Sequence, residues 1–332
     1  MAKIFIMGAG GFGSALAVML ANSCHNVFLW GHNSDHQKEL REKRTNDKLL
    51  KGVILPDNIS VVDALDGIES AEFIFIATPT FAVRDTAKLL KGRISSSAVI
   101  VSVSKGMEKD TLKLLSEVLE EEIPENPHVF LSGPSHAEEI ARGAVTVMVA
   151  ASLDHQSAQR VQELTEGSNI RIYWSDDVKG VQLGGALKNI IAFAAGVCDG
   201  LKLGDNPKAA LMTRGLAEIS RLGVKMGARG DTFMGIAGVG DLIVTCCSCH
   251  SRNHRCGVFV GEGMSCGDAV EKVGMVVEGI TATKCACALA DKYDVDMPIA
   301  KTIQRVIDGE INAKEGIALL LERPLKKESP LS

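Results

Sequence analysis

The chain has 332 residues, of which 46% are hydrophobic, 23% charged and 4% aromatic, a composition typical of a globular protein of about two domains. Its 36 basic and 41 acidic residues give a formal charge of -5, so the charge balance does not favour a nucleic acid or an anionic membrane as partner. We therefore expect a small-molecule partner, with any phosphate it carries bound by local groups.

The N-terminal residues and the cysteines indicate a cytoplasmic protein. The first strand-like run, from Lys3 to Met7, starts almost at the initiator Met and leaves no room for a targeting leader. Nine cysteines, an odd number, fit free thiols in a reducing compartment better than a disulfide framework. Lys188 and Asn189 interrupt the most apolar stretch, residues 184–200, which predicts a buried core helix and no membrane insertion.

Short β-branched runs alternate with helical patterns through the first half of the chain. The strand-like runs are KIFIM, NVFLW, AEFIFIAT, AVIVSVS, HVFLSG and VTVMVAA. They are continuously apolar, which predicts a parallel, doubly wound sheet that is covered on both faces. Strand signals stop after about Ser175, and Ala-, Gly- and Leu-rich helical patterns follow. We expect an α/β domain over residues 1–180, an all-helical domain over residues 181–325 and a polar tail over residues 326–332.

A glycine-rich loop separates the first strand from the first helix. Gly8, Gly10 and Gly13 form GxGxxG between KIFIM and a helix that begins near Ser14. In this context the three glycines permit a tight turn, close approach of a pyrophosphate, and close packing of helix on strand. The pattern predicts a dinucleotide whose phosphates bind at the helix N-terminus. The alternative is a glycine-rich turn that binds nothing.

The second strand lacks the acidic residue that usually binds the ribose of NAD. It ends in Trp30-Gly31-His32-Asn33, where an aspartate or glutamate is expected in an NAD-specific enzyme. Without a carboxylate to repel a 2'-phosphate, and with His32 available to meet one, we expect NADP to bind and NAD not to be excluded. Alternatively, His32 is an ordinary polar residue of the loop.

Lys188 stands near the middle of an otherwise apolar helix, DVKGVQLGGALKNIIAFAAGVCDGL. A buried ammonium group is unfavourable unless it is paired, and Gly184 and Gly185, one turn earlier, leave space above it for a ligand. Because burial lowers the pKa of a lysine, Lys188 is predicted to donate a proton to a ketone oxygen and to recover it in the reverse reaction. The alternative is a lysine that extends from a partly exposed helix to solvent.

A possible phosphate receptor lies in GVGDLIVTCCSCHSRN, residues 238–253. Ser251 is a candidate N-cap, and Arg252 beside a helix start offers oriented N–H groups and a guanidinium fork to a phosphate dianion. Asp241 is a candidate partner for a substrate hydroxyl or for Lys188. The alternative is a surface loop with an ordinary helix cap.

The same region contains Cys246, Cys249 and Cys256 together with His250 and His254. Cys246-x-x-Cys249 has the spacing of zinc ligands. No second Cys-x-x-Cys pair completes a zinc pattern, so we expect no metal. The sequence assigns no role to the cluster from Cys246 to Cys256.

These motifs together resemble one enzyme family. The segments GAGGFGSALA, LWGH, VSKGM, SGPSHAEE, ALKNIIAFAAG, GDLIVTC, SRN and VVEG occur in the order and spacing seen in bacterial NAD(P)-dependent glycerol-3-phosphate dehydrogenase, almost end to end. The resemblance implies a Rossmann-type domain, a helical C-terminal domain and a homodimer. It also implies interconversion of dihydroxyacetone phosphate and sn-glycerol 3-phosphate, which feeds phospholipid synthesis.

The resemblance also implies roles for individual residues. Lys188 matches the family's general acid/base. The positions that match cofactor contacts, besides the loop glycines, are Gly11, Phe12, His32, Lys105, Ala137, Arg252, Val276 and Glu278. The positions that match substrate contacts are Lys105, Gly133, Ser135, Lys188, Asp241, Ser251, Arg252 and Asn253. The family often has Trp or Tyr where this chain has Phe12, a change that keeps an aromatic ring.

Two other functions fit parts of the pattern. A dehydrogenase of similar architecture could act on a hydroxy acid, with Arg252 binding a carboxylate instead of a phosphate. A nucleotide-sensing or zinc-binding regulator would need no catalysis. Turnover with a phosphorylated ketone distinguishes the predicted enzyme from both alternatives.

Overall fold

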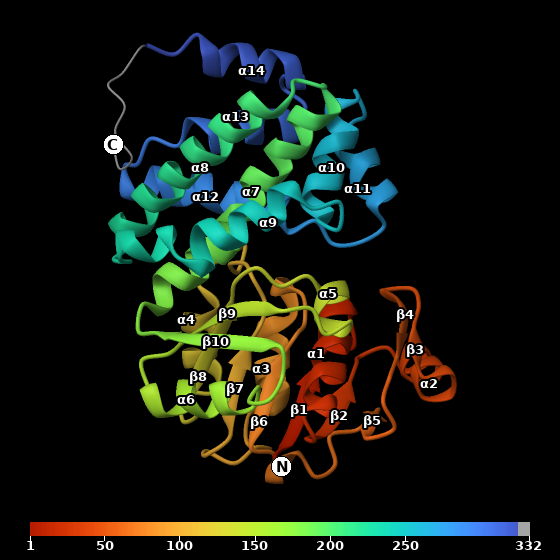
Figure 1. The fold of residues 1–332 in the computed structure, drawn as a ribbon. Coiled ribbons are helices and arrows are strands. Elements are labelled where there is room, and N and C mark those ends of the chain that lie inside the picture. Colours follow the sequence, from red (N-terminus) through yellow and green to blue (C-terminus); the bar gives the residue numbers. More distant parts are fainter. Residues whose placement is uncertain (325–332) are drawn as a thin grey trace. The chain divides into compact units, whose positions relative to one another are not determined.

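The chain forms two compact units in a computed structural model that describes residues 1–324 (Figure 1). The first unit comprises Met1–Ser104 and Leu115–Val178, and the second comprises Lys105–Leu114 and the described residues that follow Val178. The short segment Lys105–Leu114 therefore packs with the helices that follow it much later in sequence. The tail expected at residues 326–332 lies outside the described residues.

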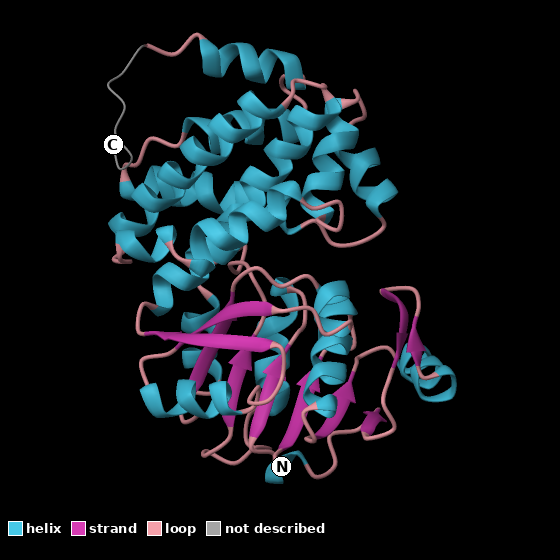
Figure 2. Cartoon of the chain, viewed as in Figure 1, coloured by secondary structure: helices cyan, strands magenta, loops and turns pink. Residues whose placement is uncertain are grey.

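An eight-stranded sheet forms the centre of the first unit, which confirms the predicted α/β class (Figure 2). Its strand order is β10-β9-β8-β7-β6-β1-β2-β5. The strands are β1 (Lys3–Met7), β2 (Asn26–Trp30), β5 (Ile59–Val62), β6 (Phe73–Ile76), β7 (Val99–Ser102), β8 (His128–Ser132), β9 (Thr146–Ala151) and β10 (Ile170–Ser175). A separate two-stranded sheet contains β3 (Thr45–Asn46) and β4 (Leu50–Ile54).

Helices of the first unit connect these strands. They are α1 (Gly11–Asn22), α2 (Ser34–Lys43), α3 (Val83–Leu90), α4 (Leu115–Glu122), α5 (Ala137–Ala141) and α6 (His155–Glu163). The crossovers β1-α1-β2 and β6-α3-β7 run in opposite directions along the sheet, so right-handed connections place α1 and α3 on opposite faces. The direction reverses between β1 and β6, where Met7 pairs with Ile76, and a crevice for a ligand is expected at that point.

One pair of strands departs from the parallel arrangement that the sequence predicts. Strands β8 and β9 are antiparallel, whereas β9 and β10 are again parallel. The connection between β8 and β9 contains one helix, the five-residue α5. The chain enters β9 from the end of the sheet at which it left β8, as an antiparallel pair requires.

The second unit is helical among its described residues, as predicted. Its helices are α7 (Val178–Gly200), α8 (Asp205–Lys225), α9 (Asp241–Cys247), α10 (Arg252–Gly261), α11 (Cys266–Val273), α12 (Glu278–Tyr293), α13 (Pro298–Ile307) and α14 (Ala313–Leu321), with short turns at Gly230–Met234 and Ile236–Gly240 before α9. Helix α7 is long and apolar enough to cross a membrane, but its most apolar window is entirely buried. This burial is typical of a core helix.

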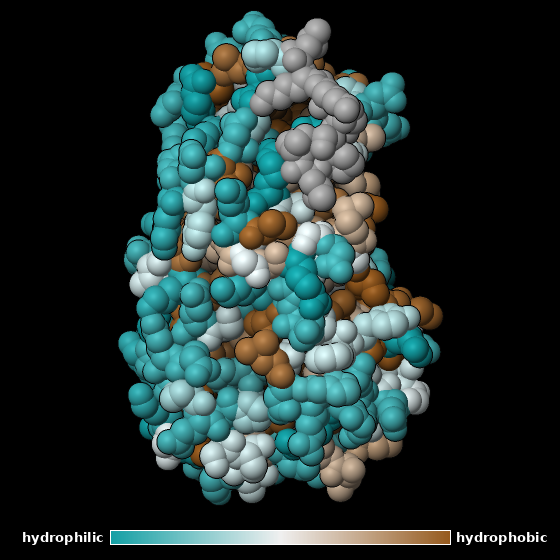
Figure 3. Space-filling model, turned by 90° about the vertical axis from the view of Figure 1, so that its left-hand side faces the viewer, coloured by the Kyte–Doolittle hydropathy of each residue, from teal (hydrophilic) through white to brown (hydrophobic). Residues whose placement is uncertain are grey.

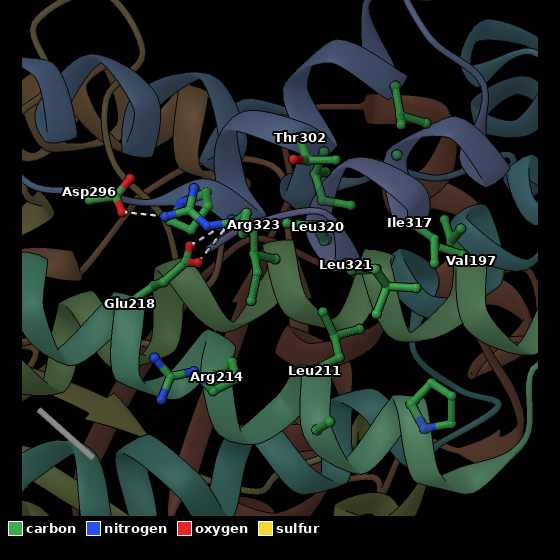
Figure 4. A pocket seen from close by; sticks show the side chains of 18 of the residues that line it. Val197, Leu211, Arg214, Glu218, Asp296, Thr302, Ile317, Leu320, Leu321 and Arg323 are labelled. Carbon is green, nitrogen blue, oxygen red and sulfur yellow. Dashed lines mark hydrogen bonds and ion pairs between the residues drawn. The ribbon is translucent and has the colours of Figure 1, made fainter. Parts of the chain in front are cut away.

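An apolar pocket of about 930 Å³ lies among α8, α13 and α14 (Figure 4). Leu211, Ile303 and Ile317 are among its lining residues. On the face drawn in Figure 3, hydrophobic surface occurs as brown patches within mostly hydrophilic surroundings, as is normal for a globular protein.

A buried carboxylate in this pocket caps helix α13. The Glu218 side chain, 3% exposed, accepts hydrogen bonds from the backbone N–H groups of Ile299, at 2.8 Å, and Ala300, at 3.3 Å. The helix has no cap from its own N-cap residue, Met297, so a residue of α8 satisfies its first N–H groups. Burial raises the pKa of Glu218 from 4.5 to about 7, against the lowering effect of these hydrogen bonds.

We expect Glu218 to make the stability of the protein depend on pH. Its folded pKa is raised, so the folded state binds a proton more tightly than the unfolded chain does. The free energy of unfolding should therefore fall by a few kcal/mol as pH rises from about 4.5 to about 7. Glu218→Gln keeps an oxygen acceptor but cannot ionise, so it should flatten this slope and unfold at a higher temperature than the parent at pH 8.

A matched control is Glu315→Gln, which alters the exposed glutamate in the capping box of α14. Thermal unfolding between pH 5 and 8 should give this control the same slope as the parent. If the stability of Glu218→Gln depended on pH as steeply as that of the parent, Glu218 would not be the source of the pH dependence.

Candidate active site

The glycine loop has the geometry that its sequence predicts. Gly8 follows β1 with a φ of 124°, a left-handed conformation that favours glycine, and its N–H donates to Trp30 O at 2.8 Å. A Cβ on Gly8 would lie 2.7 Å from Ala77 O, and one on Gly13 would lie 1.9 Å from Gly8 O. These two positions therefore exclude a side chain because strand, loop and helix are in close contact.

The N-terminus of α1 is suited to bind phosphate. Gly10 is the N-cap residue and provides no side-chain cap, so the first N–H groups of the helix are oriented toward the loop. A Cβ on Gly10 would meet no atom within 4 Å, so this glycine leaves open space rather than filling a contact. Open space beside a helix N-terminus fits the pyrophosphate of a dinucleotide.

The first unit also contains the other N-terminal residues predicted to bind cofactor or substrate. Phe12 packs against the core, and His32 is exposed after β2. Gly133, with a φ of 128°, follows β8, and its carbonyl accepts a hydrogen bond from Ser135 Oγ at 2.8 Å. Ala137 begins α5, which packs against α1. The strand ends and α1 thus bring these segments to one region of the unit.

The second unit contains a buried cluster of two lysines and one aspartate. Asp241, 1% exposed, accepts a hydrogen bond from Lys105 Nζ at 2.7 Å and another from Lys188 Nζ. Lys188 also donates to Thr245 Oγ1 at 2.8 Å. The hydroxyl of Thr245 donates to the backbone carbonyl of Asp241 at 2.6 Å. Lys188, predicted to be buried in an apolar helix, is 6% exposed in α7, which contradicts the solvent-extended alternative.

The cluster lowers the pKa values of both Lys188 and Asp241, for different reasons. Burial lowers the pKa of Lys188 to about 7, reinforced by repulsion from Lys105 and opposed by attraction to Asp241. Burial alone would raise the pKa of Asp241, but the charges of Lys105 and Lys188 more than offset it and hold that pKa below its ordinary value. The result is an ionised carboxylate beside an amine that exchanges its proton near neutral pH.

A second group of predicted residues surrounds the start of α10. The side chain of Ser251 caps the helix by accepting from His254 N at 3.2 Å. Asn253 Nδ2 donates to Asn189 Oδ1 at 2.9 Å, and Asn253 Oδ1 accepts from Gly279 N at 2.8 Å. Arg252 is the exposed first residue of α10. The predicted N-cap is therefore confirmed, and Asn253 is buried among polar partners.

Lys188 and Asn189 connect the Asp241 cluster to the residues at the start of α10, because they are neighbours in α7.

Two further predicted residues lie near the start of α12. Glu278 begins α12, next to Gly279, and Val276 is 40% exposed just before it. Sequence reasoning missed Asn189 and Thr245. The signals for both were present: Asn189 is a second polar interruption of the apolar helix, and Thr245 is one helical turn after Asp241.

The cysteine cluster is spread between interior and surface. Cys246 and Cys256 are buried, whereas Cys247 and Cys249 are exposed. Within residues 1–324, no three side chains of His, Cys, Asp or Glu are grouped in a way that could bind a metal ion.

A glycine loop between parallel strands and a buried amine of lowered pKa define the class as a nucleotide-dependent dehydrogenase. Family models described as NAD-dependent glycerol-3-phosphate dehydrogenase N-terminus and C-terminus match residues 3–158 and 177–318. The chain belongs to the NAD-dependent glycerol-3-phosphate dehydrogenase family.

Relatives with this name are similar over almost the whole chain. The glycerol-3-phosphate dehydrogenase [NAD(P)+] of Clostridium perfringens is 46% identical over 329 residues, 99% of each chain. That of Lysinibacillus sphaericus is 46% identical over 332 residues, 99% of this chain and 98% of the relative. The crystal structure of glycerol-3-phosphate dehydrogenase from Coxiella burnetii superposes with a TM-score of 0.93 at 36% identity, covering 97% of this chain and 99% of the other.

Substitution of two loop glycines should separate cofactor binding from folding. Gly10→Ala has space for its methyl group and an extended backbone that alanine adopts, so we expect an unchanged Tm. If the pyrophosphate binds in the open space beside Gly10, as the loop predicts, the added methyl group should weaken NADPH binding by about 10-fold or more. Gly13→Ala should lower the Tm by several degrees because its Cβ would overlap Gly8 O.

Thermal unfolding and NADPH titration by fluorescence measure the two effects. Unchanged NADPH affinity in Gly10→Ala would show that the dinucleotide does not bind at this loop.

Proposed function

We propose that the protein interconverts dihydroxyacetone phosphate and sn-glycerol 3-phosphate, using NADP or NAD. The observation that carries this proposal is that Lys188 and Asn189 are neighbours in α7. The buried amine of Lys188 binds Asp241, and the side chain of Asn189 binds the polar start of α10 at Ser251–Asn253. The names of the relatives agree with this chemistry.

Lys188 is proposed to transfer the proton. In ketone reduction its ammonium group donates a proton to the carbonyl oxygen, and in the reverse reaction the neutral amine accepts the proton of the hydroxyl group. When bound, the reduced nicotinamide supplies the hydride. Asp241 and Thr245 fix the direction of the Lys188 side chain, and the positive charge of Lys105 helps to hold its pKa near 7.

The start of α10 is proposed to bind the phosphate of the substrate. Arg252 offers a guanidinium fork. The first N–H groups of α10 and the positive end of its helix dipole are at the same N-terminus, and both favour a bound anion. The buried contacts of Asn253 with Asn189 and Gly279 hold this turn in place. A carboxylate could bind the same groups, so the hydroxy-acid alternative must be tested with substrates.

A substrate panel tests the proposed function. With NADPH, dihydroxyacetone phosphate should cause loss of absorbance, whereas unphosphorylated dihydroxyacetone and 2-keto acids should not. Turnover of a 2-keto acid in place of the phosphate ester would favour the hydroxy-acid enzyme. No turnover with any substrate, together with one tightly bound zinc ion, would favour a regulator.

Replacing Lys188 should affect chemistry rather than cofactor binding. Lys188→Ala removes the proton donor, so we expect turnover to fall by roughly 100-fold or more with NADPH affinity near that of the parent. Lys179→Ala, at an exposed lysine in the same helix, is the matched control and should retain full activity. Equal turnover of Lys188→Ala and the parent would remove the assigned role.

The pH dependence should differ between the two directions. Because the pKa of Lys188 is about 7, the ammonium form that reduction needs is lost as pH rises above about 7. The neutral amine that oxidation needs is lost as pH falls below that value. Initial rates with dihydroxyacetone phosphate and with glycerol 3-phosphate should therefore show opposite slopes across neutral pH.

We also propose a cytoplasmic homodimer that supplies glycerol 3-phosphate for phospholipid synthesis. The family resemblance over the whole chain supports these points, and the free cysteines fit a reducing compartment. Sedimentation of the purified protein at the mass of one chain would contradict the dimer.

A further inference from the structure

Three helix ends of the second unit meet at one carboxylate, Asp199. This residue lies in the last turn of α7, and its Oδ2 accepts a hydrogen bond from His254 Nε2, in the first turn of α10, at 2.7 Å. Lys208, in the first turn of α8, donates to Asp199 Oδ1 at 2.9 Å and to Oδ2 at 3.2 Å. Asp199 therefore links the helix that carries Lys188 to the start of α10.

Asp199 is the polar anchor of the His254 ring. Because a carboxylate accepts hydrogen bonds, His254 donates through Nε2, and its other ring nitrogen, Nδ1, is buried without a hydrogen-bond partner among the described residues. The backbone N–H of His254 donates to Ser251 Oγ at 3.2 Å. His254 thus belongs to the capped turn through its backbone and to the end of α7 through its side chain.

The turn at the start of α10 is attached to α7 on both sides of Gly196. Asn253 binds Asn189 before this glycine, and His254 binds Asp199 after it. A Cβ on Gly196 would lie 2.0 Å from His254 O, so the backbones of the two helices are in direct contact between these attachments. Arg252 precedes the two attached residues, and its position depends on both.

We propose that Asp199 is a positioning residue that acts through His254 to hold Arg252 and the first N–H groups of α10 in the geometry that binds the phosphate of the substrate. This inference rests on the proposed function. It assigns a role in substrate capture to a residue that lies about three helical turns from Lys188.

The geometry predicts that loss of the Asp199 side chain changes the orientation of the groups at the start of α10 more than it changes the stability of the fold. The Asp199 side chain is 31% exposed, and partly exposed ion pairs contribute little to folding. A small displacement of groups that bind a substrate can nevertheless weaken binding strongly. Hydrogen bonds from Lys208 and His254 offset the effect of burial and keep the pKa of Asp199 below its ordinary value, so the anchor stays charged at neutral pH.

The test compares kinetic constants of Asp199→Ala, His254→Leu and His254→Gln with those of the parent. We expect Asp199→Ala and His254→Leu to raise the KM for dihydroxyacetone phosphate by about 10-fold, with kcat within about 2-fold of the parent. The inhibition constant of inorganic phosphate, measured against dihydroxyacetone phosphate, should rise in parallel. His254→Gln retains a side-chain N–H donor and should recover most of the affinity.

The matched control is Asp291→Ala, which removes an exposed aspartate paired with Lys301 at 2.8 Å and should leave all constants unchanged. A parent protein that fails to reduce dihydroxyacetone phosphate would refute the proposed function itself. An active parent with an unchanged KM in both Asp199→Ala and His254→Leu would overturn the positioning role. So would a loss of kcat and of NADPH affinity in proportion to KM, because that pattern indicates general damage to the fold.

If Asp199→Ala does not fold, the pair His254→Leu and His254→Gln decides the question alone. Equal KM values in these two variants would also overturn the proposal.

Discussion

The buried carboxylate of Asp241 is the interaction on which the chemistry of the second unit depends. An isolated charge with 1% exposure would be strongly unfavourable, and the two ammonium groups of Lys105 and Lys188 compensate for it. The compensation is incomplete for Lys188, whose pKa falls to about 7 because burial outweighs the attraction of one shared carboxylate. Two cations that share one anion thus give an amine that can both hold and release a proton at neutral pH.

Close backbone contact is the constraint that the two units have in common. In the first unit, Gly13 lets α1 approach the turn at Gly8. In the second, Gly196 and Gly257 let α7 and α10 touch, since a Cβ on either would lie 2.0 Å from a backbone oxygen of the other helix. In each place glycine allows a helix to pack closely against its neighbour, and this close packing sets the position of the helix N-terminus. Helix N-termini are suited to bind phosphate groups.

Local signals made much of this predictable from the sequence. The glycine loop, the apolar strands and a single charge inside an apolar helix are patterns within a few residues, and each predicted its element correctly. Contacts between distant segments gave no such signal. Lys105 and Asp241 are separated by 136 positions, so the packing of Lys105–Leu114 with the second unit could not be inferred. The antiparallel pairing of β9 with β8 was likewise not predicted, because an apolar run alone does not fix the direction of a strand.

The placement of Lys188, Asn189 and Asp199 along one helix has a consequence for how substrate preference can change. The Lys188 amine is held by Asp241 and Thr245 of α9, whereas the turn at the start of α10 is attached through Asn189 and Asp199. Because different side chains fix these two parts, substitutions at the turn can change its local structure without disturbing the amine, and under the proposed roles they would change which anionic group is bound. If Lys188 and the start of α10 have the proposed roles, evolution toward new acyclic ketones requires changes at one helix start only, and the residues around Lys188 stay the same.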